Sequence, residues 1–181
     1  MVKRKLLIWI SLLSATLLLL LPYGCSTKET TTTTPQHDNE LEFEDFPLFF
    51  SLKDLDIPTQ IYIMAGKDSP LPPVIEEIFT DYQTKLKTVD YSRDFILFAF
   101  MGFQSLTGPT IEVTQIWQID NTIYIEALFD QGGPTYAPGW SSPSHIVKVS
   151  KDNMTQFGEI TFILLDQDGE ERARTICEIP E

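Results

Sequence analysis

Few side chains in this 181-residue chain are suited to catalysis, and their positions argue against a catalytic centre. The chain contains two histidines, and His37 lies in a threonine-rich segment, so a Ser-His-Asp site would have to use His145. The serines nearest to it in sequence are Ser141, Ser142 and Ser144. Nucleophile, base and acid converge through the fold, however, and not through sequence proximity. Alternation places His145 in a strand with Val147 and Val149 on the same face, so we interpret it as structural and expect no catalytic residues.

The sequence also offers little to a metal ion or a cofactor. One histidine and one cysteine in the folded part are too few for a zinc site. The turn Asp166-Gln167-Asp168-Gly169 carries carboxylates that would suit calcium, but it lacks the further oxygen ligands of an EF-hand loop, and Asp-Gly is also a hairpin turn. The sequence contains neither a phosphate-cradling glycine loop nor a dinucleotide-binding fingerprint. We therefore expect no metal and no cofactor.

The N-terminus has the layout of an export signal. Three cations, at Lys3 to Lys5, precede an apolar stretch from Leu6 to Leu21, which is shorter than the ~20 residues of a membrane-spanning helix. Cys25 follows Gly24 at the end of this stretch, an arrangement that resembles the lipobox of bacterial lipoproteins. The resemblance implies a signal peptide over residues 1–24, a lipid on Cys25 and attachment to the extracytoplasmic face of a cell membrane. An uncleaved helix and simple secretion are the alternatives, and all three place the domain outside the cytoplasm.

Charge and composition divide the rest of the chain into a tether and a domain. Removal of the signal leaves 26 acidic residues against 10 basic ones, a net charge of −16, which argues against a nucleic-acid partner. Residues 25–44 include five consecutive threonines and cannot bury enough apolar area to offset their ordering entropy. We interpret them as a disordered acidic tether, and residues 45–181 as one β-rich domain. If Cys25 carries lipid, Cys177 has no disulfide partner, and we interpret it as a small buried hydrophobe.

Hydrophobic patterning predicts a mainly β (α+β) domain, an antiparallel sheet or sandwich of six to seven strands with one helix packed on it. The run 95–101 is apolar at every position, which predicts a central strand covered on both faces. Apolar residues at helical spacing from Val74 to Leu86, after Pro73, predict the helix. The predicted strands are residues 59–64, 95–101, 110–119, 123–129, 144–150, 160–165 and 172–179.

Two of these strands form a predicted hairpin that has a consequence for function. Residues 110–119 and 123–129 alternate and are joined by Asp120-Asn121. Alternation along the first run places four apolar residues on one face: Ile111, Val113, Trp117 and Ile119. Because successive antiparallel connections alternate between the ends of a sheet, the loops 102–109 and 130–143 should be neighbours.

These two loops carry the candidate binding residues. The second is 14 residues long and contains three glycines and three prolines, and loops of this length are usually functional or disordered. Its aromatic residues are either lids on the edge of the core or part of a binding site shared with the first loop. The candidate partner-binding residues are Phe103, Gln104, Leu106, Thr107, Tyr136 and Trp140.

Several short motifs resemble a known family in their order along the chain. They are Val89-Asp90-Tyr91-Ser92-Arg93-Asp94 before the apolar strand, Met101-Gly102-Phe103-Gln104 with Thr107-Gly108, and Pro143-Ser144-His145-Ile146-Val147-Lys148-Val149-Ser150-Lys151. Together they look like the C-terminal domain of PrcB-type protease-complex subunits, over about residues 59–151. The resemblance implies an accessory subunit that stabilises or assembles an extracytoplasmic protease, and it implies no catalysis.

The sequence therefore favours a non-enzymatic, membrane-tethered lipoprotein that binds a partner protein such as a secreted protease. The first alternative is an inhibitor that inserts these loops into a protease cleft. The second is a structural envelope domain without a specific partner.

Overall fold

The computed structural model describes residues 38–48, 50–52, 56–78, 80–133 and 137–181. The chain divides into two compact units, Met1–Pro35 and Gln36–Glu181, and all described residues belong to the second. The predicted signal peptide, Cys25 and the tether as far as residue 37 lie outside the described residues. Within the described ranges, no helix has the length and apolar character needed to cross a membrane.

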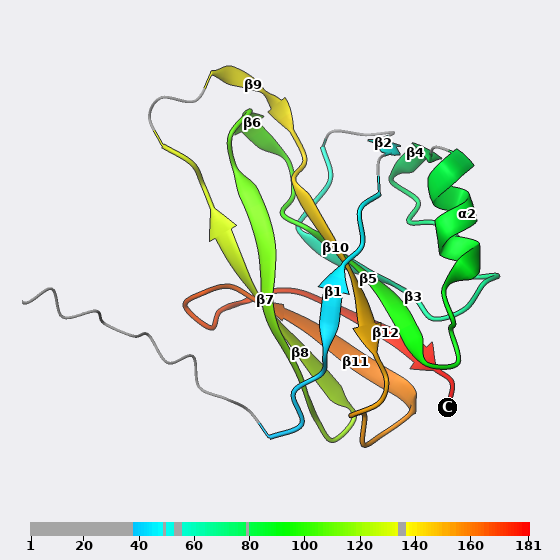
Figure 1. Cartoon of the computed structure of the whole chain (residues 1–181). Coiled ribbons are helices and arrows are strands. Elements are labelled where there is room, and N and C mark those ends of the chain that lie inside the picture. Colours follow the sequence, from blue (N-terminus) through cyan, green and yellow to red (C-terminus); the bar gives the residue numbers. More distant parts are fainter. Residues whose placement is uncertain (1–37, 49, 53–55, 79, 134–136) are drawn as a thin grey trace, which may run out of the picture. The chain divides into compact units, whose positions relative to one another are not determined.

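Two four-stranded sheets form the framework of the second unit (Figure 1). The first has the order β1 (Phe43–Asp45), β10 (Ser144–Ser150), β5 (Asp94–Phe100) and β3 (Gln60–Met64). The second has the order β12 (Glu171–Ile179), β11 (Gly158–Leu165), β8 (Thr122–Asp130) and β7 (Thr110–Ile119). Two small sheets pair β2 (Phe50–Leu52) with β4 (Ile75–Ile78), and β6 (Gln104–Leu106) with β9 (Pro138–Ser141). The helix α2 spans Thr80–Thr88.

The predicted fold class is confirmed: the domain is mainly β with a helix on one sheet, and every strand pair except parallel β8–β11 is antiparallel. The described strands of five or more residues are the seven that the patterning predicts. The shorter strands contain too few residues for an alternating apolar pattern to be visible in the sequence.

Strand β5 is the centre of the domain, as its uninterrupted apolar sequence predicts. It pairs with β10 on one side and β3 on the other, and Phe95 to Phe100 are fully buried. Phe95, Leu97 and Ala99 belong to the core between the two sheets, where the ring of Phe95 lies 5.8 Å from that of Phe162. The alternate residues Ile96, Phe98 and Phe100 belong to a second core with Leu86 of α2. A strand with two apolar faces thus divides the interior into two cores.

The helix is shorter than predicted. Residues 75–78 form β4 and pair with β2, so the helix begins at Thr80 and not after Pro73. The apolar spacing of this segment fits a helix and a short buried strand equally well, and the available partner strand decides between them. Asp81 in the first turn and Lys85 and Lys87 in the last turn match the helix dipole.

The predicted hairpin of β7 and β8 is confirmed, but one predicted buried position is wrong. The register shifts between Val113 and Gln115, which is a β-bulge. A bulge exchanges the two faces of a strand, so Ile116 becomes fully buried while Ile119, predicted to face inward, is 52% exposed. Gln118 also becomes buried, and its side-chain oxygen accepts a hydrogen bond from the amide of Thr155 at 2.7 Å.

The domain begins earlier than the predicted boundary at residue 45. Leu41, predicted to belong to the tether, is 1% exposed, and its amide donates to the carbonyl of Ile116 in β7 at 2.8 Å. Two residues later the chain joins the other sheet, where Phe43 pairs with Val149 of β10. This segment therefore crosses from one sheet to the other along their edge.

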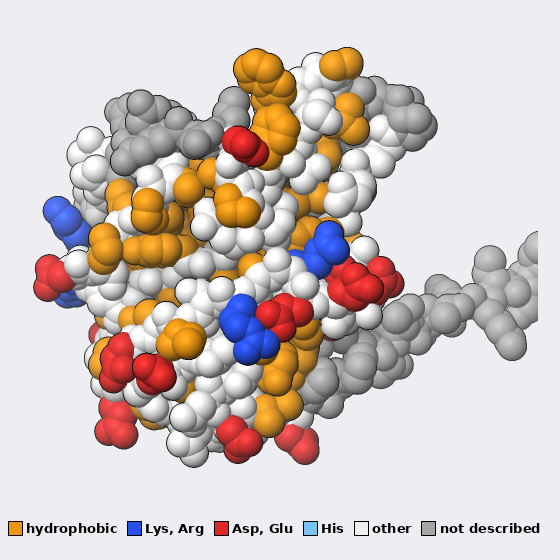
Figure 2. All heavy atoms as spheres, turned by 180° about the vertical axis from the view of Figure 1, so that it is seen from behind, with side chains coloured by type: hydrophobic (Ala, Val, Ile, Leu, Met, Phe, Trp, Pro, Cys, Tyr) orange, Lys and Arg blue, Asp and Glu red, His pale blue; other side chains and the backbone are white. Residues whose placement is uncertain are grey.

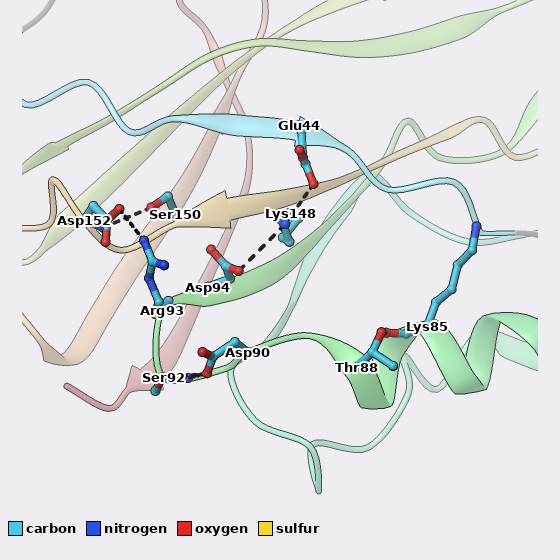
Figure 3. Close-up of polar contacts among 10 residues, drawn as sticks. All are labelled: Glu44, Lys85, Thr88, Asp90, Ser92, Arg93, Asp94, Lys148, Ser150 and Asp152. Atoms are coloured by element: carbon cyan, nitrogen blue, oxygen red, sulfur yellow. Dashed lines mark hydrogen bonds and ion pairs between the residues drawn. The ribbon is translucent and has the colours of Figure 1, made fainter.

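Polar contacts hold β1, β10 and β5 together on the outer side of the first sheet. Figure 3 shows Lys148 of β10 between two carboxylates, with Glu44 of β1 at 2.8 Å and Asp94 of β5 at 3.9 Å. The hydrogen bond to Glu44 is the main reason that the pKa of Lys148 is raised. Next to it, Arg93 forms an ion pair with Asp152 at 3.1 Å.

Lys151, the residue that follows β10, binds both the segment before β5 and the C-terminal segment. The residue is 5% exposed, and its ammonium group donates to the carbonyls of Tyr91 and Pro180, both at 2.8 Å. Burial lowers the pKa of Lys151 from its ordinary value of 10.5, while Asp94 and Asp90 partly oppose this effect. The native state therefore favours the neutral amine more than the unfolded state does.

We predict that Lys151→Met destabilises the domain by about 1–3 kcal/mol, because the buried hydrogen bond to the carbonyl of Tyr91 and the partly buried one to the carbonyl of Pro180 are both lost. A neutral amine keeps the two N–H donors that these carbonyls need, so raising the pH toward 10.5 should stabilise the parent chain relative to the variant. Urea unfolding of both chains at pH 8 and pH 10 measures this difference. A difference that stays constant or narrows at pH 10 would contradict the assignment.

Candidate functional site

The two loops predicted to be neighbours form one two-stranded extension of the first sheet. Strands β6 and β9 pair antiparallel, with Gln104 opposite Ser141 and Leu106 opposite Pro138. Beyond them, the amide of Thr107 donates to the carbonyl of Ala137 at 3.3 Å. The predicted adjacency is therefore confirmed. We call residues 102–109 and 137–143 the arm.

The arm continues the central strand pair of the domain. Strands β5 and β10 pair up to Phe100 and Ser144, and the amide of Met101 then donates to the carbonyl of Pro143 at 2.9 Å. The pairing resumes in β6 and β9 after this bridge. In Figure 1 the arm accordingly extends past the end of the sheet, at the top of the view. The arm is thus anchored in the most deeply buried strand of the protein.

A glycine permits the bend where the arm leaves the sheet. Gly102 has φ +92°, and a Cβ atom at this position would lie 2.9 Å from the backbone nitrogen of Thr59. The hydroxyl of Thr59 donates to the carbonyl of Met101 at 2.7 Å, and the amide of Phe103 donates to the carbonyl of Ile57 at 2.9 Å. Segment 57–59 therefore holds the base of the arm on both sides of the bend.

Close contacts also fix the two strands of the arm to each other. The hydroxyl of Ser141 donates to the carbonyl of Leu106 at 2.6 Å, and that of Thr107 donates to the carbonyl of Ala137 at 3.3 Å. Gly139 lies so near the methyl group of Thr107 that a Cβ atom would collide with it. A side chain at Gly139 would therefore require the side chain of Thr107 to move.

The arm brings together five of the six candidate residues. Trp140 is 73% exposed and Phe103 is 38% exposed, although both lie on backbone that is hydrogen bonded to its neighbours. Gln104 and Leu106 are half-buried, and Thr107 is exposed. Tyr136 lies outside the described residues. For Trp140, the structure excludes the alternative in which the loop aromatic folds back as a lid on the core.

The arm also has a compositional signal that the patterning overlooked. Segments 102–109 and 131–143 contain no Asp, Glu, Lys or Arg, although 22% of the whole chain is charged. In Figure 2 the end that carries β6 and β9 shows hydrophobic and uncharged side chains, while most visible acidic groups lie lower on this face. Depletion of charge together with exposed aromatic residues is typical of the centre of a protein interface.

Both ring nitrogens of the histidine that a catalytic triad would need form hydrogen bonds within the fold. Nδ1 of His145 accepts a hydrogen bond from the amide of Val113 at 2.8 Å, so Nε2 carries the proton and donates to Asp45 at 3.1 Å. Val113 lies beside the bulge of β7, and Asp45 ends β1. The ring therefore links both sheets, and neither nitrogen is available to take a proton from a nucleophile.

The remaining chemical candidates also have structural roles. Asp166 is 6% exposed, and its Oδ1 accepts hydrogen bonds from the amides of Asp168 and Glu170, both at 3.0 Å, which shapes the turn between β11 and β12. Among the described residues, no group of three or more His, Cys, Asp or Glu side chains is placed to hold a metal ion. Cys177 is half-buried against the core, and burial raises the pKa of its thiol, which disfavours the reactive thiolate.

Comparison with known proteins identifies no relative. No family model, no curated protein and no solved structure matches the chain.

We predict that Gly102→Ala displaces the base of the arm. Alanine at φ +92° is strained, and its methyl group meets the backbone of segment 57–59, so we expect a loss of roughly 1–3 kcal/mol. Chemical denaturation measures the loss, and amide exchange at Phe103 reports on the arm. Gly133→Ala is the matched control, because its Cβ would meet no atom within 4 Å. Equal effects of the two substitutions would contradict the role of Gly102.

A second prediction separates the two hydrogen bonds of His145. His145→Ala leaves the amide of Val113 without its acceptor and should cost about 1–3 kcal/mol. His145→Asn restores an acceptor near the position of Nδ1 and should recover at least half of that loss. The carboxylate of Asp45 is 82% exposed, so Asp45→Ala should cost less than about 1 kcal/mol. A larger loss in Asp45→Ala than in His145→Ala would reverse this ranking.

Proposed function

We propose that the protein is a non-enzymatic accessory or stabilising subunit that binds a partner protein through the arm. The observation that carries this proposal is the 73% exposure of Trp140 on a strand whose backbone is fixed by pairing with β6. A tryptophan side chain has 150–250 Å² of surface, so covering the exposed part offers roughly 3–4 kcal/mol of gross binding free energy. The fold itself leaves most of this surface uncovered.

The arm is suited to recognition because it is ordered before it binds. Its anchorage in β5 and its contacts with segment 57–59 limit the conformational entropy lost on binding. Trp140 and Phe103 then act as rigid aromatic anchors, which are common among the residues that dominate interface energies. Half-buried Gln104 and exposed Thr107 supply polar groups beside them.

The absence of charge in the arm sequence specifies the kind of contact. A complementary surface on the partner is an apolar recess with hydrogen-bonding groups at its edge, and not a basic patch. Binding through such a contact responds weakly to salt, whereas attraction to the acidic surface elsewhere on the chain falls as salt rises. Salt dependence therefore distinguishes binding by the arm from non-specific attraction.

The location and the partner class in this proposal rest on sequence patterns. The export signal and Cys25 support an extracytoplasmic domain held to the cell membrane by lipid. The resemblance to PrcB-type subunits supports a secreted protease as the partner. An inhibitor that inserts the arm into a protease cleft is the second candidate, and it is favoured by the same projecting ribbon and exposed tryptophan.

We predict that a photo-crosslinking residue at position 105 of the full-length tethered chain, which is exposed in β6 and lies beside β9, captures one specific protein in its own envelope. The same residue at position 176, which is also exposed, should not capture that protein. Trp140→Ala should weaken binding of the identified partner at least tenfold and change the unfolding free energy by less than ~0.5 kcal/mol. The control Ile176→Ala, at the 60% exposed position in β12, should leave binding unchanged.

The identified partner then decides between the candidates. A protease that is stabilised by the full-length chain supports the accessory role, whereas a protease that is slowed supports the inhibitor. Equal crosslinking at positions 105 and 176, or binding that Trp140→Ala does not weaken, would contradict a role for the arm. Either result would favour the remaining alternative, a structural envelope domain without a specific partner.

A further inference from the structure

His145 lies at the base of the arm, where its two segments lead into different sheets. Segment 102–109 leads directly into β7 of the second sheet, and segment 137–143 leads directly into β10 of the first. His145 is the second residue of β10, and its Nδ1 accepts the amide hydrogen of Val113 in β7 at 2.8 Å. A side chain of one sheet thus holds the backbone of the other sheet beside the arm.

The hydrogen bond between Val113 and His145 requires a neutral ring. Nδ1 accepts a hydrogen bond only while it carries no proton, because the imidazolium ion has an N–H donor at both nitrogens. A proton taken from water onto Nδ1 would point at the amide hydrogen of Val113, and two donors repel each other. Histidine in general takes up a proton near pH 6.5, so this bond is compatible with neutral pH and opposed in mild acid.

Solvent reaches the ring, and a carboxylate is in place to hold its charged form. The side chain of His145 is 20% exposed, and it borders an open hollow of about 220 Å³ that Asp45 and residues 46–48 also line. Nε2 lies 3.1 Å from Oδ1 of Asp45, the last residue of β1. A positive charge on the ring strengthens this contact. Protonation therefore weakens the contact with β7 and strengthens the contact with β1.

The other charged groups on the surrounding elements do not contact the ring. Glu44 of β1 and Lys148 of β10 pair with each other at 2.8 Å. Asp94 is the first residue of β5, at the end of that strand opposite the arm, and residues 46–48 are uncharged. Glu112 of β7 is exposed, on the outer face of its sheet. Within the described residues, Asp45 is therefore the charged group that decides where an imidazolium at this position goes.

We propose that His145 is a pH-sensitive link between the two sheets: in mild acid its ring releases Val113 of β7 and pairs with Asp45 of β1. After the release, β7 remains paired with β8 but is no longer held to β10 at the base of the arm. The two sheets then separate locally beside the arm, while the strand pairs within each sheet stay intact. This inference does not depend on what the arm binds.

The test follows the full-length chain by NMR between pH 7.5 and pH 5.0, a window in which ordinary Asp and Glu carboxyl groups stay mostly ionised. We expect Nδ1 of His145 to gain a proton. With the same midpoint, the exchange protection of the Val113 amide, corrected for the intrinsic effect of pH on exchange, should fall at least fivefold. The amide of Leu97, in the centre of β5, should keep its protection. A ring that stays neutral to pH 5.0, a protonated ring with unchanged protection at Val113, or an equal fall at Leu97 would overturn the proposal.

Three variants assign the response to the ring. His145→Asn offers Val113 an acceptor that does not titrate, so protection at Val113 should become independent of pH in this window. His37→Asn is the matched control at the other histidine of the chain and should leave the response unchanged. Asp45→Asn removes the charge that attracts the imidazolium and should move the midpoint to lower pH. A response that persists in His145→Asn, disappears in His37→Asn or keeps its midpoint in Asp45→Asn would overturn the assignment.

Discussion

The apolar side chains on both faces of β5 impose the constraint from which the rest of the architecture follows. Six consecutive residues, Phe95 to Phe100, lose all contact with water, and that requires a separate cover on each face. The second sheet covers one face and α2 covers the other. Strands β10 and β3 satisfy the backbone on both sides, so the central strand has no free edge. A single run of sequence thus determines two cores and three layers.

The same constraint explains why the arm is a suitable place for recognition. A projecting ribbon of a few residues is marginally stable by itself. This one continues a strand pair that cannot move without opening both cores, and Gly102 sets its direction through a conformation that other residues rarely adopt. Segment 57–59 braces the bend from the adjoining chain. Residues at the end of the arm are therefore exposed and positioned at the same time, which is what a binding surface requires.

The local sequence pattern was sufficient to predict the long strands. The short strands, the bulge and the side-chain contacts depend on pairing between residues that are far apart in the sequence. The β5 run, the β7–β8 hairpin and the adjacency of the two loops were all predictable, because apolar periodicity and alternation of connections are visible in sequence. The pairing within the arm was not, since strands of three or four residues rich in Gly, Pro and Ser show no period. The bulge at Val113 reversed the predicted exposure of Ile119. The partners of His145 lie 32 and 100 residues away, and no local pattern identifies them.

The proposed binding site in the arm lies directly after β5 in the sequence and contains a group that the fold does not use. The arm presents an aromatic ring to water. The polar side chains of Lys151, His145 and Asp166, by contrast, all form hydrogen bonds within the fold. A large aromatic ring that the fold leaves exposed is a place where function is expected, because it contributes little to stability. Its position next to β5, which is fully buried and paired on both edges, gives the arm a fixed base.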